Sequence, residues 1–253
     1  MSTPKVQTGW WRPMVGRDQD EPHRASTPLE LLFDLCFVVG VAEVAAQLHH
    51  SEAAGHALEA LPGYLVGFFL IWWAWMNFTW FASAYDTDDV PYRLLTLLQI
   101  GGVLILTAGV PAAFASYDFT VAVAGYIVMR VAMVIQWLRA AREHPATRRS
   151  TLRYAVGIGL CQVGWLIRLA LPAPWNALLF AALSATELGI PAWAEASGQP
   201  TPWHAGHIAE RYGLFTIIVL GECVFAATTA IQAAIARVAS RRRCSSPASA
   251  ACC

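Results

Sequence analysis

Seven long apolar stretches follow one another along the chain, separated by short polar or proline-containing connections. They cover about residues 29–48, 63–84, 94–114, 119–138, 152–171, 175–193 and 211–235. Each is close to the roughly 20 residues that an α-helix needs to cross the hydrocarbon core of a bilayer, and each is apolar on all sides. Lipid admits only helices or closed barrels, and no stretch alternates like a barrel strand. The pattern predicts an all-α, polytopic transmembrane helical bundle with about seven spans.

The polar segments predict an orientation. Residues 1–28 are polar and contain Arg12, Arg17 and Arg24, so we expect a cytoplasmic N-terminal segment rather than a signal peptide. Arginine is also concentrated in the connection between the fourth and fifth stretches, whereas the first, third and fifth connections contain neither lysine nor arginine. Positively charged loops stay in the cytoplasm. The N-terminus and the even-numbered connections are therefore expected to be cytoplasmic.

Residues 237–253 form a polar tail that is unlike a finished domain end. With seven spans, its arginines at 241–243 would lie outside the cell, against the charge rule. The tail indicates a truncation or frame shift, with a native chain that continues into further helices. Residues 31–43 and 210–222 resemble each other and end in Glu43 and Glu222. They would then mark two six-helix repeats, the second cut short.

Composition narrows the functional classes. Apolar residues make up 57% of the chain and charged residues only 13%, about half the share usual in soluble domains. The formal net charge is zero, so the lipid bilayer and not nucleic acid is the expected partner, with a homo-oligomer left open. The six cysteines show no metal-ligand spacing, and no nucleotide loop or serine nucleophile motif is present. We expect no metal, no cofactor and no enzymatic activity.

Carboxylates within the apolar stretches are candidate functional groups, because a charge at the bilayer centre costs about 2.5–3.5 kcal/mol on insertion scales. Asp34, Glu43 and Glu222 lie well inside their stretches. Glu30 lies four residues before Asp34 and shares its helix face near the cytoplasmic end. Glu30 is either a solvated acid of the first turn or part of the same site.

Two arginines and a further glutamate lie in the fourth to sixth stretches. Arg130 is central and is expected to pair with Asp34, Glu43, Glu187 or Glu222, whereas Arg168 is expected to extend to the membrane interface. Glu187 lies four residues before Pro191. Either a kinked helix frees a backbone carbonyl beside it and makes a proton or cation site, or the helix ends at Ile190.

A polar group opens the seventh stretch: His204, His207, Glu210 and Arg211. The spacing of three and four residues places the last three on one helix face. We expect an interfacial hydrogen-bonded cluster. A three-ligand metal site and a lipid-modifying enzyme are the alternatives, although the spacing of zinc proteases is lacking.

Several segments resemble the bacterial low temperature requirement A (LtrA) family. The most specific runs from His207 to Phe215 (HIAERYGLF) and on to Leu220-Gly221-Glu222. The others are His23 to Ser26 with LELLFDLCFV at 29–38, Trp73-Ala74-Trp75 with Asn77-Phe78, YDTDD at 85–89 with Arg93-Leu94-Leu95, Tyr126 with Arg130, and Glu187 with Pro191. They span about residues 23–230. The resemblance implies a multi-pass protein of the bacterial inner membrane, usually longer than this chain and associated by name with growth in the cold, without an established reaction.

Two functions remain open. In the first, a transporter or channel moves protons or small cations along a charge path of Asp34, Glu43, Glu187 and Glu222, with Arg130 setting their charge states. In the second, a non-transporting membrane protein supports envelope adaptation or partner assembly, and its buried charges are structural pairs.

Overall fold

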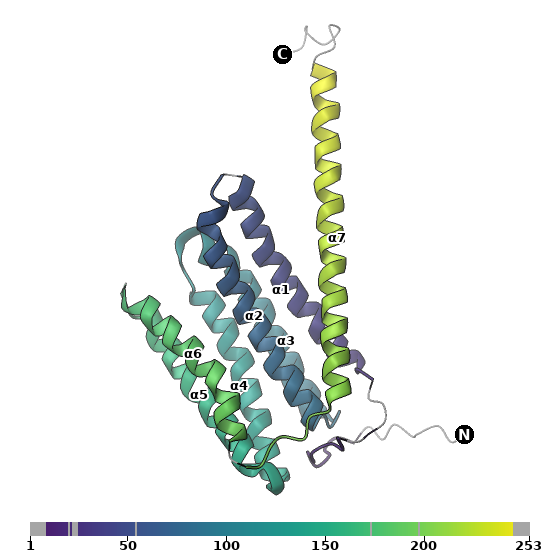
Figure 1. Cartoon of the computed structure of the whole chain (residues 1–253), viewed down its shortest axis with the longest axis vertical. Helices are drawn as coiled ribbons and strands as arrows, with labels where there is room; N and C mark the ends of the chain where they lie inside the picture. Colours follow the sequence, from purple (N-terminus) through teal and green to yellow (C-terminus); the bar gives the residue numbers. More distant parts are fainter. Residues whose placement is uncertain are drawn as a thin grey trace, which may run out of the picture.

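Seven α-helices and one short 3-10 turn make up the described part of the chain, which contains no β-strand (Figure 1). This computed structural model describes residues 9–19, 21, 25–53, 55–172, 174–196 and 198–244. The helices are α1 (Pro28–Ala53), α2 (Ala57–Tyr85), α3 (Val90–Ser116), α4 (Thr120–Glu143), α5 (Arg148–Leu169), α6 (Trp175–Glu195) and α7 (Ala205–Cys244), and the turn η1 is Pro145–Thr147. The predicted all-α fold class is confirmed.

Five of these helices, α2, α3, α4, α6 and α7, are long and apolar enough to cross a membrane. The other two, α1 and α5, have 26 and 22 residues and so reach the length of a span. They differ in charge: α1 contains Glu30, Asp34 and Glu43, and α5 begins with Arg148 and Arg149. Both pack between neighbouring helices. The charged helices are therefore part of the bundle.

Several helix ends differ from the expected ones, most clearly in α7. This helix begins at Ala205, earlier than the expected start near residue 211, and continues to Cys244 through part of the expected polar tail. Residues 245–253 of that tail lie outside the described residues, as do 1–8, 20 and 22–24 of the expected N-terminal segment. The alternative helix end at Ile190 is wrong, because α6 continues through Pro191 to Glu195.

Side-chain caps explain where two helices begin. Before α1, the Thr27 backbone N–H donates to Glu30 Oε2 at 2.8 Å, and the Glu30 N–H donates to Thr27 Oγ1 at 3.2 Å, which is a reciprocal capping box. Before α3, Asp89 accepts the Tyr92 N–H at 3.0 Å, and Pro91 occupies the first turn. Both caps leave a carboxylate at a helix start, where the helix dipole favours negative charge.

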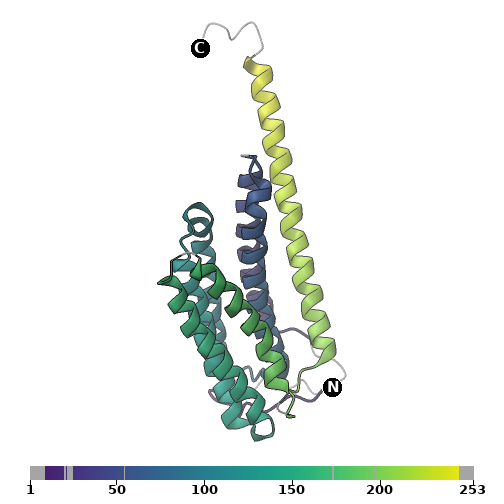
Figure 2. The same ribbon diagram turned by 60° about the vertical axis from the view of Figure 1, so that its left-hand side comes forward.

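The helices form a central group, α1 to α4, with the α5–α6 pair on one side and α7 on the other (Figures 1 and 2). The crossing of α3 and α4 is the tightest, because glycines face one another there. A methyl group added at Gly125 would collide with the Leu106 backbone nitrogen and the Gly102 carbonyl oxygen, and one at Gly109 with the Ala122 backbone. Small residues let helix backbones approach in this way in membrane proteins.

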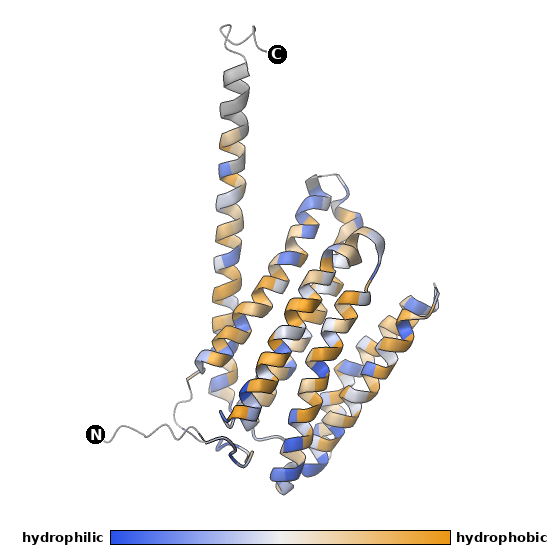
Figure 3. Cartoon of the chain, turned by 180° about the vertical axis from the view of Figure 1, so that it is seen from behind, coloured by the Kyte–Doolittle hydropathy of each residue, from blue (hydrophilic) through white to orange (hydrophobic). Residues whose placement is uncertain are grey.

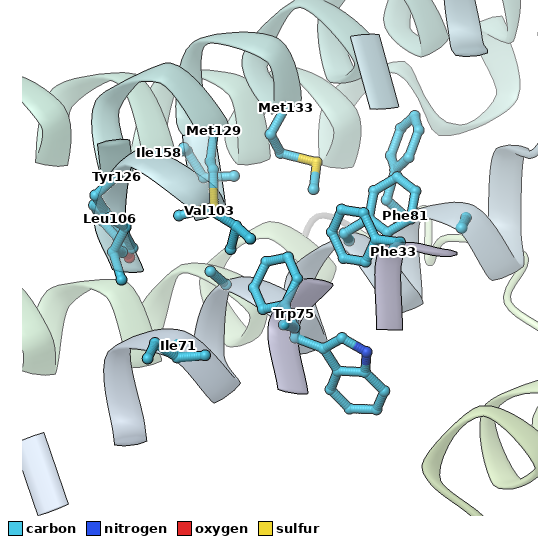
Figure 4. Close-up of a cluster of buried hydrophobic side chains, with 14 of the residues drawn as sticks. Phe33, Ile71, Trp75, Phe81, Val103, Leu106, Tyr126, Met129, Met133 and Ile158 are labelled. Atoms are coloured by element: carbon cyan, nitrogen blue, oxygen red, sulfur yellow. The ribbon is translucent and has the colours of Figure 1, made fainter. Parts of the chain in front are cut away.

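Large apolar side chains fill the space between α1, α2, α3 and α4. Phe33 of α1 stacks on Phe78 of α2 with ring centroids 4.0 Å apart, and Trp75 and Phe81 are also fully buried. Figure 4 shows Phe33 and Phe81 beside Met133 of α4, whereas the Trp75 ring points away from that methionine. The outer helix surfaces are largely apolar too, whereas hydrophilic residues gather toward the helix ends (Figure 3).

An N-terminal strap, residues 9–19, lies across one end of the bundle. It donates backbone N–H groups from Arg12 to Asp89 Oδ2 at 3.0 Å and from Gly16 to His144 Nδ1 at 3.2 Å. Arg139 of α4 binds Asp89 as an ion pair and donates to the Arg12 carbonyl at 2.7 Å. Gln19 of the strap donates its side-chain amide to the Trp203 carbonyl at 3.4 Å. The α2–α3, α4–α5 and α6–α7 connections therefore meet the N-terminal strap at the same end.

Candidate functional site

Four ionisable side chains meet in the interior where α1 and α7 approach each other. This α1–α7 charge cluster comprises Glu30 and Asp34 of α1 and His207 and Arg211 of α7, and each is at most 1% exposed. Arg211 Nη2 donates to Asp34 Oδ1 at 2.6 Å, and Arg211 Nη1 lies 3.5 Å from Glu30 Oε1. His207 Nε2 lies 3.3 Å from the same Glu30 oxygen.

Helical spacing aligns the groups of this cluster. Glu30 and Asp34 are four residues apart on α1, and His207 and Arg211 are four apart on α7, so each pair occupies one face. Helix α2 supplies a third such pair. Trp75 Nε1–H donates to Asp34 Oδ1 at 2.6 Å, and Arg211 Nη2 donates to Thr79 Oγ1 at 3.4 Å. Three helices thus close around the charges.

The α1–α7 charge cluster combines charges of both signs with unused polar atoms. Among the described residues, its two carboxylates face one guanidinium and one histidine. Asp34 Oδ2, Arg211 Nε and His207 Nδ1 are buried without a hydrogen-bond partner among the described residues. Buried charge is costly unless it is paired. A buried cluster of two carboxylates and a histidine with unused polar atoms is suited to take up a proton or a small cation.

A second buried pair joins α4 and α6. Arg130 Nη2 lies 3.0 Å from Glu187 Oε2, and Tyr126 of α4 donates its hydroxyl to the same oxygen. The other Glu187 oxygen accepts the Trp165 Nε1–H of α5 at 2.9 Å. This Arg130–Glu187 pair is neutral, and both carboxylate oxygens have donors.

The structure divides the expected charge path. Glu187, among the four carboxylates considered, is the partner of Arg130, while Asp34 belongs to the α1–α7 charge cluster. Glu43 and Glu222 are half-buried on α1 and α7. Glu43 accepts the Gln47 amide at 2.8 Å, and no described residue forms an ion pair with Glu222.

The polar group at the start of α7 is also divided. His207 and Arg211 face the buried cluster, whereas Glu210 accepts the Ser26 N–H at 3.2 Å and His204 Nε2 lies 2.8 Å from the Glu21 carbonyl. His204 Nδ1 accepts the His207 N–H at 3.1 Å and so caps α7. In the described part of the chain, no three His, Cys, Asp or Glu side chains gather as metal ligands. The three-ligand alternative therefore finds no support in the geometry.

One open alternative and one expectation about charged side chains are wrong. Glu30 is not a solvated acid of the first turn, because α7 packs over it and brings His207 and Arg211 to its carboxylate. Arg168 does not extend to an interface; it is 5% exposed, with its guanidinium near the rings of Phe119, Trp165 and Phe180. The sequence-based reasoning also missed Trp75 and Trp165 as hydrogen-bond donors to buried carboxylates. Their spacing along α2 and α5 contains no signal for that role.

The comparisons with known proteins agree with the resemblance. Residues 25–246 match the family model described as bacterial low temperature requirement A protein (LtrA). An uncharacterized protein of Rhizobium meliloti (strain 1021) is 30% identical over 227 residues, which is 86% of this chain and 53% of that protein. The chain thus spans about half the length of this relative. No solved structure matches the chain.

Proposed function

Because this chain belongs to the bacterial low temperature requirement A (LtrA) family of membrane proteins, we propose that it works as a proton- or small-cation-linked transporter or channel. The burial of the α1–α7 charge cluster carries the proposal. Two carboxylates, one guanidinium and one histidine lie together there, and each is at most 1% exposed.

His207 is the group of the cluster best suited to exchange a proton. A histidine ring can hold or release a proton at a ring nitrogen, and His207 Nε2 lies 3.3 Å from Glu30 Oε1. A proton on this ring would strengthen the contact with Glu30, and its loss would weaken that contact. Buried ionisable groups of this kind mark ion pathways and proton relays in membrane proteins.

One of the remaining acids of α1 and α7 extends the proposed path. Both helices run in the same direction (Figure 1). Glu43 lies nine residues beyond Asp34, and Glu222 lies eleven beyond Arg211, which is about 14 and 17 Å at about 1.5 Å per residue. Glu222 shares the helix face of Arg211 and is the next half-buried carboxylate for a proton or cation that leaves the cluster along α7, whereas Glu43 lies on the opposite face of α1 from Asp34.

The Arg130–Glu187 pair takes no exchange step in this proposal. Its charges cancel, and Tyr126 and Trp165 occupy the carboxylate. Such a pair fixes how α4, α5 and α6 pack. A non-transporting membrane protein would also need such a structural pair. The proton-flux experiment described below distinguishes the two functions.

The orientation belongs to the same proposal. The N-terminal strap and the even-numbered connections meet at one end of the bundle, and this end carries Arg12, Arg139 and Arg149. Following the charge rule, we place this end in the cytoplasm and the helices in the bacterial inner membrane. The α1–α7 charge cluster then lies toward the cytoplasmic leaflet.

Proton flux in liposomes tests the proposal. The protein is reconstituted with a pH-sensitive dye inside, a potassium gradient with valinomycin makes the interior negative, and the initial rate of internal acidification is measured. We expect acidification above that of protein-free liposomes, and rates at least about tenfold lower in Asp34→Asn and His207→Gln. The same liposomes with a sodium gradient test the small-cation version.

A matched control is Glu52→Gln, also on α1, because the Glu52 side chain is 70% exposed. Its flux should equal that of the wild type. If neither protons nor sodium move above background, or if Asp34→Asn and His207→Gln leave the rates unchanged, the transport proposal is wrong. The non-transporting function then stands.

A further inference from the structure

A cavity of about 370 Å³ is lined by residues from all helices from α1 to α6, at the end of the bundle away from the N-terminal strap. Its walls are mainly apolar and come from the first half of α2, the last turns of α3 and the first turns of α4. The exposed side chains of Glu59 and Tyr117 border its opening. The volume falls within the range of about 300–1,000 Å³ that is typical of small-molecule sites.

Arg168 is the one charged side chain that is buried among the described residues of the cavity wall. It lines the cavity and is 5% exposed. Its guanidinium carbon lies 4.9 Å from the ring centre of Phe119 and 5.1 Å from that of Phe180. No carboxylate of a described residue pairs with it, and its Nε–H is buried without a partner.

Aromatic rings alone leave this arginine unsatisfied. Ring faces attract a cation, but they do not accept the five in-plane N–H groups of a guanidinium. Every other buried arginine that the structure describes has a carboxylate partner: Asp89 for Arg139, Glu187 for Arg130, and Glu30 and Asp34 for Arg211. Among the described residues, Arg168 thus has no anionic partner, unlike the other three arginines. It also lies on the wall of a cavity.

We propose that this cavity binds an amphipathic anion, with its carboxylate or phosphate against Arg168 and its apolar body between α2, α3 and α4. The guanidinium fork matches both head groups, since each offers two oxygens to parallel N–H donors. The apolar walls select a ligand with a hydrocarbon part, and the positive charge rejects cationic amphiphiles. Glu59 at the opening is paired with His56 at 3.2 Å and lies in solvent, so it opposes entry of an anion only weakly.

This site is separate from the α1–α7 charge cluster. Tyr126 and Trp165 line the cavity, and their hydroxyl and indole N–H groups donate hydrogen bonds to Glu187. The ligand would therefore lie next to the neutral Arg130–Glu187 pair and would not touch Asp34 or His207. Binding and proton flux can be tested independently.

Binding of defined probes to the purified protein in detergent, followed by native mass spectrometry, tests the proposal. Hexadecanoate and hexadecan-1-ol share a chain length and differ in head-group charge. We expect hexadecanoate to bind at least about tenfold more tightly, since a hydrogen bond to a charged group contributes far more than a neutral one. Arg168→Gln should remove this preference and keep the weak binding of the alcohol, which shows that the cavity is intact.

Two further variants sharpen the result. Arg153→Gln is the matched control, because Arg153 lies on the same helix over the ring of Trp193 and outside the cavity; it should bind hexadecanoate like the wild type. Ala122→Phe, which fills the cavity wall, should weaken both probes. Equal binding of the two wild-type probes, or an unchanged preference in Arg168→Gln, would overturn the proposal.

The source of the anion is decided with phosphatidylglycerol, phosphatidylcholine and inorganic phosphate. Selective binding of phosphatidylglycerol that depends on Arg168 supports a lipid head group. Binding of hexadecanoate alone supports a free amphiphile. Binding of inorganic phosphate as tight as that of either would contradict the need for an apolar body.

Discussion

Replacing Arg130 by glutamine would leave Glu187 ionised and buried without its cation. The two side chains are 2% and 5% exposed and their charged atoms are 3.0 Å apart. Breaking a buried pair from one side costs about 3–5 kcal/mol, because the remaining charge is uncompensated. Glu187→Gln should cost a similar amount, since it leaves the guanidinium of Arg130 unpaired.

The double variant Arg130→Gln/Glu187→Gln should cost less than either single variant. Both charges are gone, and the amide oxygen at position 187 can still accept the Tyr126 hydroxyl and the Trp165 N–H. Unfolding in mixed micelles with increasing dodecyl sulfate, followed by circular dichroism, gives the four free energies of the cycle. Glu43→Gln is the control and should change stability by no more than about 1 kcal/mol, because its carboxylate has only the Gln47 hydrogen bond. Single variants that each cost under about 1 kcal/mol, or a double variant that costs their sum, would refute a coupled buried pair.

Two further predictions concern the ends and the centre of the bundle. Burial raises the pKa of Asp89, but hydrogen bonds from Arg139, Arg12 and Tyr92 outweigh it and hold this pKa below the usual 3.8. The ionised Asp89 carboxylate therefore contributes its full stabilisation above pH 3.8, and this stabilisation is lost as the pH falls through the lower pKa of the folded state. Below pH 4, the free energy of unfolding should fall steeply with pH in the wild type and less steeply in Asp89→Asn. Gly125→Ala should destabilise by about 1–3 kcal/mol through backbone collision with α3, whereas Gly101→Ala, with open space around it, should be neutral or slightly stabilising in the same unfolding assay.

The helices were predictable because lipid demands long apolar segments, and each of the seven stretches corresponds to a helix. The buried pairs were only partly predictable. The central position of Arg130 indicated that it pairs with a carboxylate. Its partner is 57 residues away, and four acids within the apolar stretches were equally suitable as partners. Arg211 and Asp34 are 177 residues apart, so no local spacing indicates that α7 packs on α1.

The prediction for Arg168 was wrong for a related reason. Because Arg168 lies in the last turn of α5, we expected its guanidinium to extend to water at the membrane interface. The rings that enclose it belong to Phe119 before α4 and Phe180 of α6, and only the packing of three helices shows that the guanidinium is enclosed.

The N-terminal strap has a consequence for the order in which the chain is completed. Its residues are synthesised first, yet the acceptors of Met14 and Gly16 are Glu143 and His144, 129 and 128 residues later. Gln19 waits even longer, because its side chain donates to the Trp203 carbonyl, 184 residues ahead. Chains emerge N-terminus first at about 5–20 residues per second. The strap therefore stays undocked for several seconds of translation. Met14 and Gly16 wait until four helices have been made and Gln19 until six, so complete docking marks a chain that already has its first six helices.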